Sequence, residues 1–220
     1  MELLFEARWR FLEGALNTIA IFLASSLVAL ILAFIVGLMR GSNSKGLKAF
    51  AIIFIEFFRG IPLLVQLFWL FFVLPFFEIH LQPITTAIIA FGLCNGAYGA
   101  VIVHAAIENV PRGQSEAAVS LNYRPGTRMW RILIPQAIPA MLPPFGNLAI
   151  ELLKATALVS LITIKDLTFQ AVTIQQTTMR VFEPFSIVLL GYFLIALCVT
   201  GLFRLLERRM NYGLERGGLR

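Results

Sequence analysis

The residue types that perform catalysis or bind metals are few in this sequence. Its two histidines, His80 and His104, lie far apart, and no group of residues has the ligand spacing of a metal site. The two cysteines, Cys94 and Cys198, lie inside apolar runs, which argues against a disulfide framework or thiolate ligands. No glycine-rich loop ends in Gly-Lys-Ser or Gly-Lys-Thr, so any ATP must be bound elsewhere. The sequence therefore predicts neither an enzyme nor a metal or cofactor site.

A polar stretch interrupted by prolines, residues 116–139, lies between two long apolar runs. Its first part predicts a short helix, because Ser115 is able to cap the start and Glu116 would lie in the first turn, where the helix dipole favours an anion. Asn122 tolerates the left-handed backbone conformation that ends a helix. A short helix held outside a bilayer by two apolar spans is typical of a docking element.

Other polar residues lie within the apolar runs. Asn95 and Tyr98, one helical turn apart, are surrounded by the small residues between Gly92 and Ala100. Small residues allow helices to pack closely in lipid, whereas polar groups at mid-membrane depth usually face a bundle interior or a wet cavity. This segment is therefore either a helix interface or part of a path for a solute.

Glu151 and Lys154 are spaced i,i+3 in a later apolar run, and Asn147 precedes Glu151 by one helical turn. Two interpretations remain open. The charged residues form a neutralised structural pair, or the three side chains form a polar wall of the same path.

A similar pair, Glu56 and Arg59, lies just before Gly60 and Pro62. The two charged side chains, again spaced i,i+3, are predicted to pair at the cytoplasmic end of a span. The alternatives are a contact with a cytoplasmic partner or a hinge at Gly60 and Pro62.

Composition indicates what kind of scaffold must position these residues. Of 220 residues, 59% are hydrophobic and 14% are charged, and the mean hydropathy is +0.84, which is typical of a polytopic membrane protein. Because a hydrocarbon core needs about 20 apolar residues, five runs are long enough to cross it. We therefore expect an all-α fold with a single transmembrane domain over residues 1–220 and five transmembrane helices. The predicted spans are residues 14–39, 49–77, 84–107, 132–153 and 185–206.

Charge between the spans predicts the topology. The net charge of +6 comes from basic residues that cluster in the first loop, in residues 108–131 and in the C-terminal tail, which includes Arg216 and Arg220. Residues 75–83 contain no lysine or arginine. By the positive-inside rule, the N-terminus is outside and the C-terminus cytoplasmic. The basic excess is thus explained by topology, and no nucleic-acid partner is expected.

Prolines mark the fourth span. Four of them, Pro135, Pro139, Pro143 and Pro144, each remove a backbone donor, so this span is predicted to bend or unwind. Interrupted backbone survives in a membrane only where protein or a water-filled cavity satisfies it.

These motifs resemble a known family. Glu116-Ala117-Ala118, followed by Leu121-Asn122 and Ile134-Pro135-Gln136-Ala137, is similar to the cytoplasmic signature of bacterial ABC-importer permeases. A narrower similarity, to permeases for ectoine and hydroxyectoine, is carried by residues 66–69, 141–147 and 151–160. The polar amino acid branch of that family is similar over most of residues 14–212. The motifs that carry this similarity are Glu56 to Leu67, Gly96-Ala97-Tyr98, Leu142 to Asn147 and Leu152 to Thr156.

The resemblance implies a type I ABC-importer permease fold in the bacterial inner membrane. An ATPase subunit that binds ATP and Mg would dock on a coupling helix formed by Glu116, Ala117, Ala118, Leu121 and Asn122. It also implies a second permease subunit, identical or paralogous, and an external solute-binding protein. The candidates for the substrate path are Asn95, Tyr98, Asn147, Glu151, Lys154 and Thr156.

The sequence departs from the family pattern in a few places. Asn122 replaces the usual glycine of the loop motif, and Val101 and His104 stand where many polar amino acid permeases carry glutamate and arginine. Near the fourth span, Ala155 and Ala157 replace a common aspartate and serine, and Glu151 stands where serine is frequent. One lost and one rearranged acid suggest a zwitterionic or modified substrate. The alternative function, a self-contained secondary transporter or channel, would more often show an internal repeat, which is not obvious here.

Overall fold

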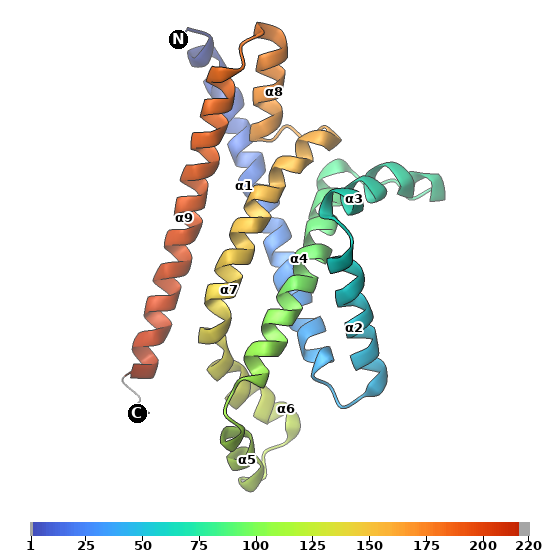
Figure 1. Cartoon of the computed structure of the whole chain (residues 1–220), viewed down its shortest axis with the longest axis vertical. Coiled ribbons are helices and arrows are strands. Elements are labelled where there is room, and N and C mark those ends of the chain that lie inside the picture. Colours follow the sequence, from blue (N-terminus) through green and yellow to red (C-terminus); the bar gives the residue numbers. More distant parts are fainter. Residues whose placement is uncertain (1, 216–220) are drawn as a thin grey trace.

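The computed structural model describes the backbone of residues 2–215 and the side chains of residues 8–210, and this part of the chain is helical with no strand (Figure 1). Arg216 and Arg220, predicted to belong to the basic tail, lie outside the described residues. The elements are α1 (Glu2–Arg40), α2 (Lys45–Gly60), α3 (Leu63–Phe68), the π-helix η1 (Trp69–Val73), the 3-10 helix η2 (Leu74–Phe77), α4 (Pro83–Glu108), α5 (Arg112–Ser120), α6 (Pro125–Arg128), the π-helix η3 (Met129–Leu133), α7 (Ile134–Ala155), the 3-10 helix η4 (Thr156–Ile162), α8 (Leu167–Thr178) and α9 (Phe182–Glu215).

Within the described residues, four helical segments are long and apolar enough to cross a membrane. They are Arg8–Arg40, Pro83–Glu108, Pro125–Ile162 and Phe182–Met210, and a fifth crossing is added if α2 and α3 to η2 count as one span. The prediction of an all-helical polytopic protein is confirmed. The predicted run 49–77 is not one straight helix, because the chain bends by 97° between Gly60 and Leu63.

The first loop, α5, α6 and the C-terminal end of α9 lie at one end of the molecule, whereas α8 and the start of α4 lie at the other (Figure 1). This arrangement brings the three basic segments together, as the charge pattern predicts. Which end faces the cytoplasm stays a prediction based on that pattern.

Small residues hold α1 and α4 in close contact. A Cβ atom at Gly92, Gly96 or Gly99 would lie 2.5–2.8 Å from side-chain atoms of α1, which is closer than packing allows. Close backbone approach is the main source of helix association in lipid, where no hydrophobic force drives it. The small-residue segment of α4 is therefore a helix interface, as one of the two interpretations predicted.

The prolines do not break the fourth span. α7 runs without interruption through Pro139, Pro143 and Pro144, and Pro135 lies in its first turn, where no intrahelical N–H is needed. The π-helical η3 comes immediately before it and joins it to α6. The fourth span is therefore not unwound, and its predicted bend stays a prediction. The predicted loop 108–131 ends early because helix resumes at Pro125.

Buried Asp166 anchors the end of the molecule opposite α5. Its Oδ1 atom accepts a hydrogen bond from the Phe169 N–H (2.8 Å) as the N-cap of α8, and its Oδ2 atom accepts one from the Tyr192 hydroxyl of α9 (3.3 Å). The adjacent Leu167 N–H donates to the Thr18 hydroxyl of α1 (3.2 Å). One turn thus ties α8 to α1 and α9.

Replacing Asp166 by alanine should lower the free energy of unfolding by about 1–3 kcal/mol, because it removes an N-cap and leaves the Tyr192 hydroxyl without this acceptor. Asp166→Asn keeps an oxygen for the Phe169 N–H and should cost less. Thermal unfolding of the purified transporter in detergent measures both changes. Equal losses for the two variants would contradict the capping role.

The same aspartate makes stability depend on pH. Burial raises the pKa of Asp166 above its ordinary value, so the folded state holds this proton more tightly than the unfolded state. Its contribution to stability therefore falls as pH rises through the interval between the two pKa values. We expect Asp166→Asn to remove this part of the pH dependence.

Candidate functional site

A cleft of about 360 Å³ opens where the bend after α2 meets α4 and α7. Its lining residues are Arg59, Gly60, Ile61, Pro62, Leu63, Cys94, Asn95, Tyr98, Glu151 and Ala155. The cleft combines residues that the sequence predicted for two different roles, the substrate path and the hinge. It is therefore the candidate site for a solute.

Arg59 reaches this cleft from the last turn of α2. Its guanidinium carbon lies 5.0 Å from the centre of the Tyr98 ring, a cation–π contact between α2 and α4. Arg59 lies fourteen residues after Lys45, which is about 21 Å along the helix from the first loop at 1.5 Å per residue. The predicted position at the loop end of the span is thus not observed.

Neither predicted i,i+3 ion pair forms. Among the described side chains, Arg180 pairs with Glu183 at 3.6 Å, and His104 lies 3.6 Å from Glu108, a contact that is an ion pair only when the imidazole is protonated. Glu56 is exposed on α2 without a pair, because Arg59 turns to Tyr98 instead. Glu151 likewise makes no ion pair with Lys154, and it lies exposed in the cleft.

Asn95 supplies the neutral polar group of the cleft. The residue is buried, and its Nδ2 atom donates to the Phe91 carbonyl oxygen of the preceding turn (2.9 Å). This bond satisfies one donor and fixes the orientation of the side chain. The Oδ1 atom accepts no hydrogen bond within the part of the chain that the structure describes, so it is available to a bound solute.

Three predicted path residues lie elsewhere. Asn147 lines a separate cleft of about 220 Å³ between α7 and α9, and Lys154 is exposed outside the lining of the first cleft. Thr156 is fully buried, and its hydroxyl donates to the Leu153 carbonyl oxygen (2.7 Å).

Arg59, like Gly60 and Pro62, is a cleft residue for which the sequence predicted a different role. The available signal was its position, since a lone arginine ten residues into an apolar run is costly in a membrane unless it serves a site. The packing of α2 on α4 that brings Arg59 to Tyr98 could not be read from the spacing of Gly60 and Pro62 alone.

The polar stretch 116–122 forms a distinct surface. α5 begins at Arg112, so Ser115 does not cap it and Glu116 lies in its second turn rather than its first. The left-handed conformation predicted for Asn122 is confirmed, with φ of 59°. The Tyr123 and Asn122 N–H groups donate to the Ala118 and Val119 carbonyl oxygens (3.0 and 2.8 Å), which closes the helix as a Schellman motif.

Helix α5 presents side chains of different character to solvent. Glu116 and Ala117 are exposed, Ala118 is buried, and Leu121 is 70% exposed at the end of the helix. The segments α6 and η3 pack against α5, and the Gln136 side chain of α7 donates a hydrogen bond to the Gln114 side chain (3.2 Å). The surface is thus connected to α7, the helix that carries Glu151.

Comparison with known families decides the class of protein. Residues 29–212 match the model of the binding-protein-dependent transport system inner membrane component family. The chain belongs to this family. It is therefore a multi-pass permease subunit of the bacterial inner membrane and not an enzyme, and the predicted ABC-importer class is confirmed.

Individual relatives agree with the family. The permease is 44% identical to a probable amino-acid ABC transporter permease of Sinorhizobium fredii, y4tF, over 89% of this chain and 84% of that protein. It is 32% identical to the L-cystine transport system permease TcyB of Bacillus subtilis, over 96% and 91% of the two chains. A crystal structure of an amino acid ABC transporter with histidines superposes with a TM-score of 0.86 at 36% identity, covering 94% and 96%.

Proposed function

We propose that the permease imports a polar amino acid or a related zwitterion, such as the compatible solutes ectoine and hydroxyectoine, through the cleft between α2, α4 and α7. The observation that carries this proposal is that Arg59 and Glu151 line one cleft without pairing with each other or with another described residue of opposite charge. A cation and an anion that stay separate match the carboxylate and the ammonium group of a zwitterion. The relatives that carry amino acids support the same class of substrate.

The energy for import would come from a partner. We propose that an ABC ATPase docks on the coupling helix, formed by Glu116, Ala117, Ala118, Leu121 and Asn122, and that its movement drives alternating access. The path for this movement is α5 to α6 and η3, which continue into α7 and so into Glu151. A second permease subunit and an external solute-binding protein complete the transporter, while Gly60 and Pro62 supply the bend that such a movement would change. The alternative function, a secondary transporter, would need no ATPase.

The substrate proposal predicts a large loss of uptake in Glu151→Gln. A charge-assisted hydrogen bond is worth about 1.5–3 kcal/mol, so the loss of this charge should reduce uptake about 10- to 100-fold. Uptake into proteoliposomes with the binding protein and ATPase present measures it. Lys154→Gln is the matched control, because that side chain is on the same helix but outside the cleft lining. Equal uptake by the two variants would assign Glu151 to a structural role.

A further inference from the structure

The bend after α2 leaves a backbone acceptor without its usual partner. In a continuous helix, the Phe58 carbonyl oxygen would accept a hydrogen bond from the N–H of residue 62. Residue 62 is proline, which has no N–H, and Ile61 has extended backbone (φ −104°, ψ 131°). The end of α2 must therefore find another donor or remain unsatisfied in a membrane, where unpaired backbone groups are strongly disfavoured.

Gln66 supplies that donor from the first turns of α3. Its Nε2 atom lies 2.8 Å from the Phe58 carbonyl oxygen and 2.8 Å from the Ile61 carbonyl oxygen, so both N–H groups of one amide bind the end of α2. The side chain is buried, and its Oε1 atom accepts no hydrogen bond from any described residue. Since the unpaired oxygen makes this position unfavourable, the favourable contribution of the amide is its two donated hydrogen bonds.

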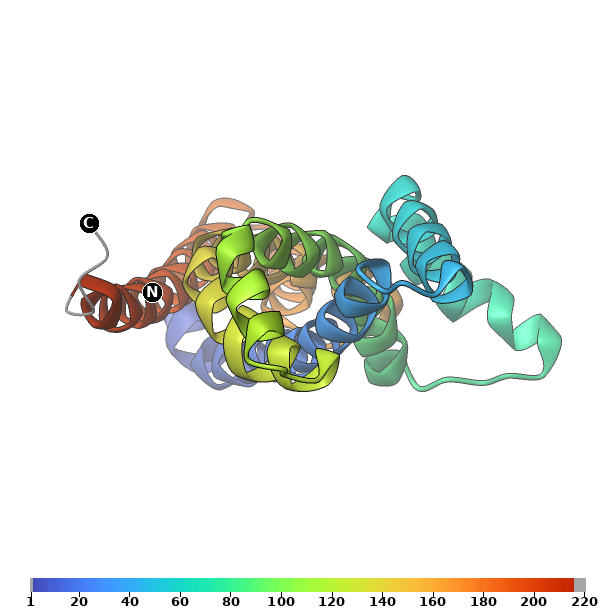
Figure 2. The ribbon, with the colours of Figure 1, turned by 90° about the horizontal axis from the view of Figure 1, so that it is seen from below.

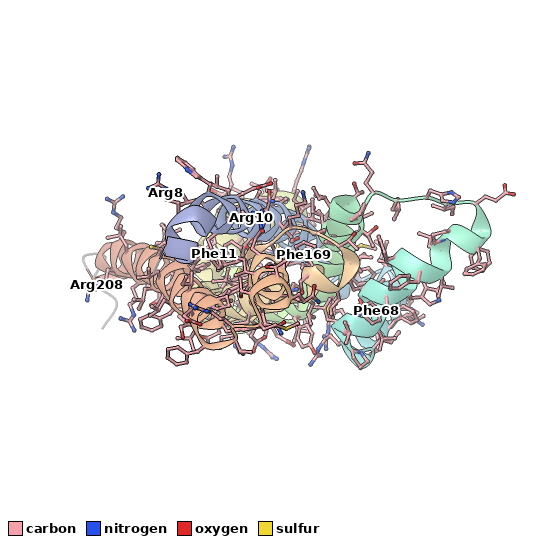
Figure 3. All side chains as sticks on the ribbon, turned by 90° about the horizontal axis from the view of Figure 1, so that it is seen from above. Arg8, Arg10, Phe11, Phe68, Phe169 and Arg208 are labelled. Atoms are coloured by element: carbon pink, nitrogen blue, oxygen red, sulfur yellow. The ribbon has the colours of Figure 1, made fainter. Side chains whose placement is uncertain are left out.

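We propose that Gln66 is a positioning residue for transport. By donating hydrogen bonds to the carbonyl oxygens at the end of α2, its side chain holds the bend that keeps Arg59 at the cleft. The inference rests on the proposed function insofar as the cleft receives the substrate. Gln66 binds the carbonyl oxygens of Phe58 and Ile61. These two residues flank Arg59 and Gly60, so the two hydrogen bonds enclose the residues at the cleft. In Figure 3 the following segment extends to one side, away from Phe11, while its Phe68 packs against the buried core.

The position of this segment explains why the bend needs the hydrogen bonds of Gln66. Seen from below, the segment after α2 extends to one side of the bundle (Figure 2), whereas α2 itself packs on α1 and α4. One side of η1 packs within this chain through Leu70 and Phe71, whereas Trp69, Phe72 and Val73 are exposed. Gln66 and Leu67, in contrast, are buried at the root of the projection. Its angle is therefore set close to the bend, where Gln66 acts.

The test replaces Gln66 by methionine, which has similar length and no donor. Spin labels at Ile53 of α2 and Phe76 of η2, both exposed, report the bend as a distance distribution in a transporter whose two cysteines are changed to alanine. We expect Gln66→Met to broaden this distribution and to lower uptake about tenfold relative to the same labelled parent. Gln176→Met, at an exposed glutamine of α8, is the control and should change neither measurement.

The proposal requires both the broader distance distribution and the lower uptake in Gln66→Met. An unchanged distance distribution, or uptake within twofold of the parent, overturns the positioning role. Gln66→Asn, which keeps two donors on a shorter side chain, is the test variant if Gln66→Met does not assemble. We expect it to broaden the distance distribution less than Gln66→Met would. An unchanged distribution would contradict the proposal. Glu151→Gln separates the two proposals, because it should lower uptake without changing the distribution. If Glu151→Gln transports normally while Gln66→Met shows both effects, the role of Gln66 stands and the zwitterion assignment fails.

Discussion

Replacing Leu121 by aspartate should abolish ATP-driven uptake while leaving the permease folded. Leu121 ends α5 with 70% of its surface exposed, an arrangement suited to burial against a partner. Truncation of an apolar anchor in an interface typically costs 2 kcal/mol or more, and a charge adds the cost of its desolvation. We therefore expect at least about a 30-fold weaker affinity for the ATPase. Co-purification of the two subunits and ATPase activity in proteoliposomes measure it.

The controls separate docking from folding. Leu47→Asp places the same charge on another exposed leucine near the first loop, outside the coupling helix, and should retain the ATPase. Glu116→Lys reverses the charge of an exposed carboxylate on α5 and should weaken docking less than Leu121→Asp, since one exposed ion pair contributes little. If Leu121→Asp keeps full uptake, the coupling surface does not include the end of α5.

Spans could be predicted from the sequence because their signal is local. A run of about 20 apolar residues crosses a hydrocarbon core whatever it packs against, and the predicted runs 84–107 and 185–206 lie within α4 and α9. The end of α5 was also predictable, since the tolerance of Asn122 for a left-handed conformation is a property of one residue.

The start of α5 and the course of α7 were not predictable in the same way. Ser115 has a capping side chain, but Pro111 comes earlier and its fixed φ lets the helix begin at Arg112. The prolines of α7 remove donors as expected, yet the helix continues through Pro139, Pro143 and Pro144. Each proline costs free energy because it removes a backbone donor. Packing of the whole helix determines whether the segment stays helical despite that cost.

The candidate site depends on contacts between distant segments, which spacing along one helix does not reveal. Glu56 and Arg59 have the separation of an ion pair, but Arg59 contacts Tyr98, 39 residues further along the chain. That contact joins the end of α2 to α4 beside the 97° bend, where Gln66 donates to the Phe58 carbonyl oxygen that Pro62 leaves without an N–H donor. The hinge and the path were thus predicted as separate features, although they form one cleft.

Arg59→Ala tests the cleft most severely. The variant removes the candidate partner of a substrate carboxylate and the contact with Tyr98, so we expect uptake to fall about 100-fold, corresponding to about 3 kcal/mol. Arg59→Lys keeps the charge but loses the planar, bidentate group, and should therefore be intermediate. Uptake at matched levels of assembled transporter measures both variants.

A control arginine shows whether charge alone matters. Arg180 pairs with Glu183 on the exposed surface at the far end of the molecule, and Arg180→Ala should leave uptake within about twofold of the parent because exposed pairs contribute little. Near-normal uptake by Arg59→Ala would show that the substrate carboxylate is not bound at the end of α2. A loss in Arg59→Ala that Arg59→Lys restores completely would show that the site needs a positive charge but not the stacked guanidinium, so that Tyr98 would serve only to hold the side chain in place.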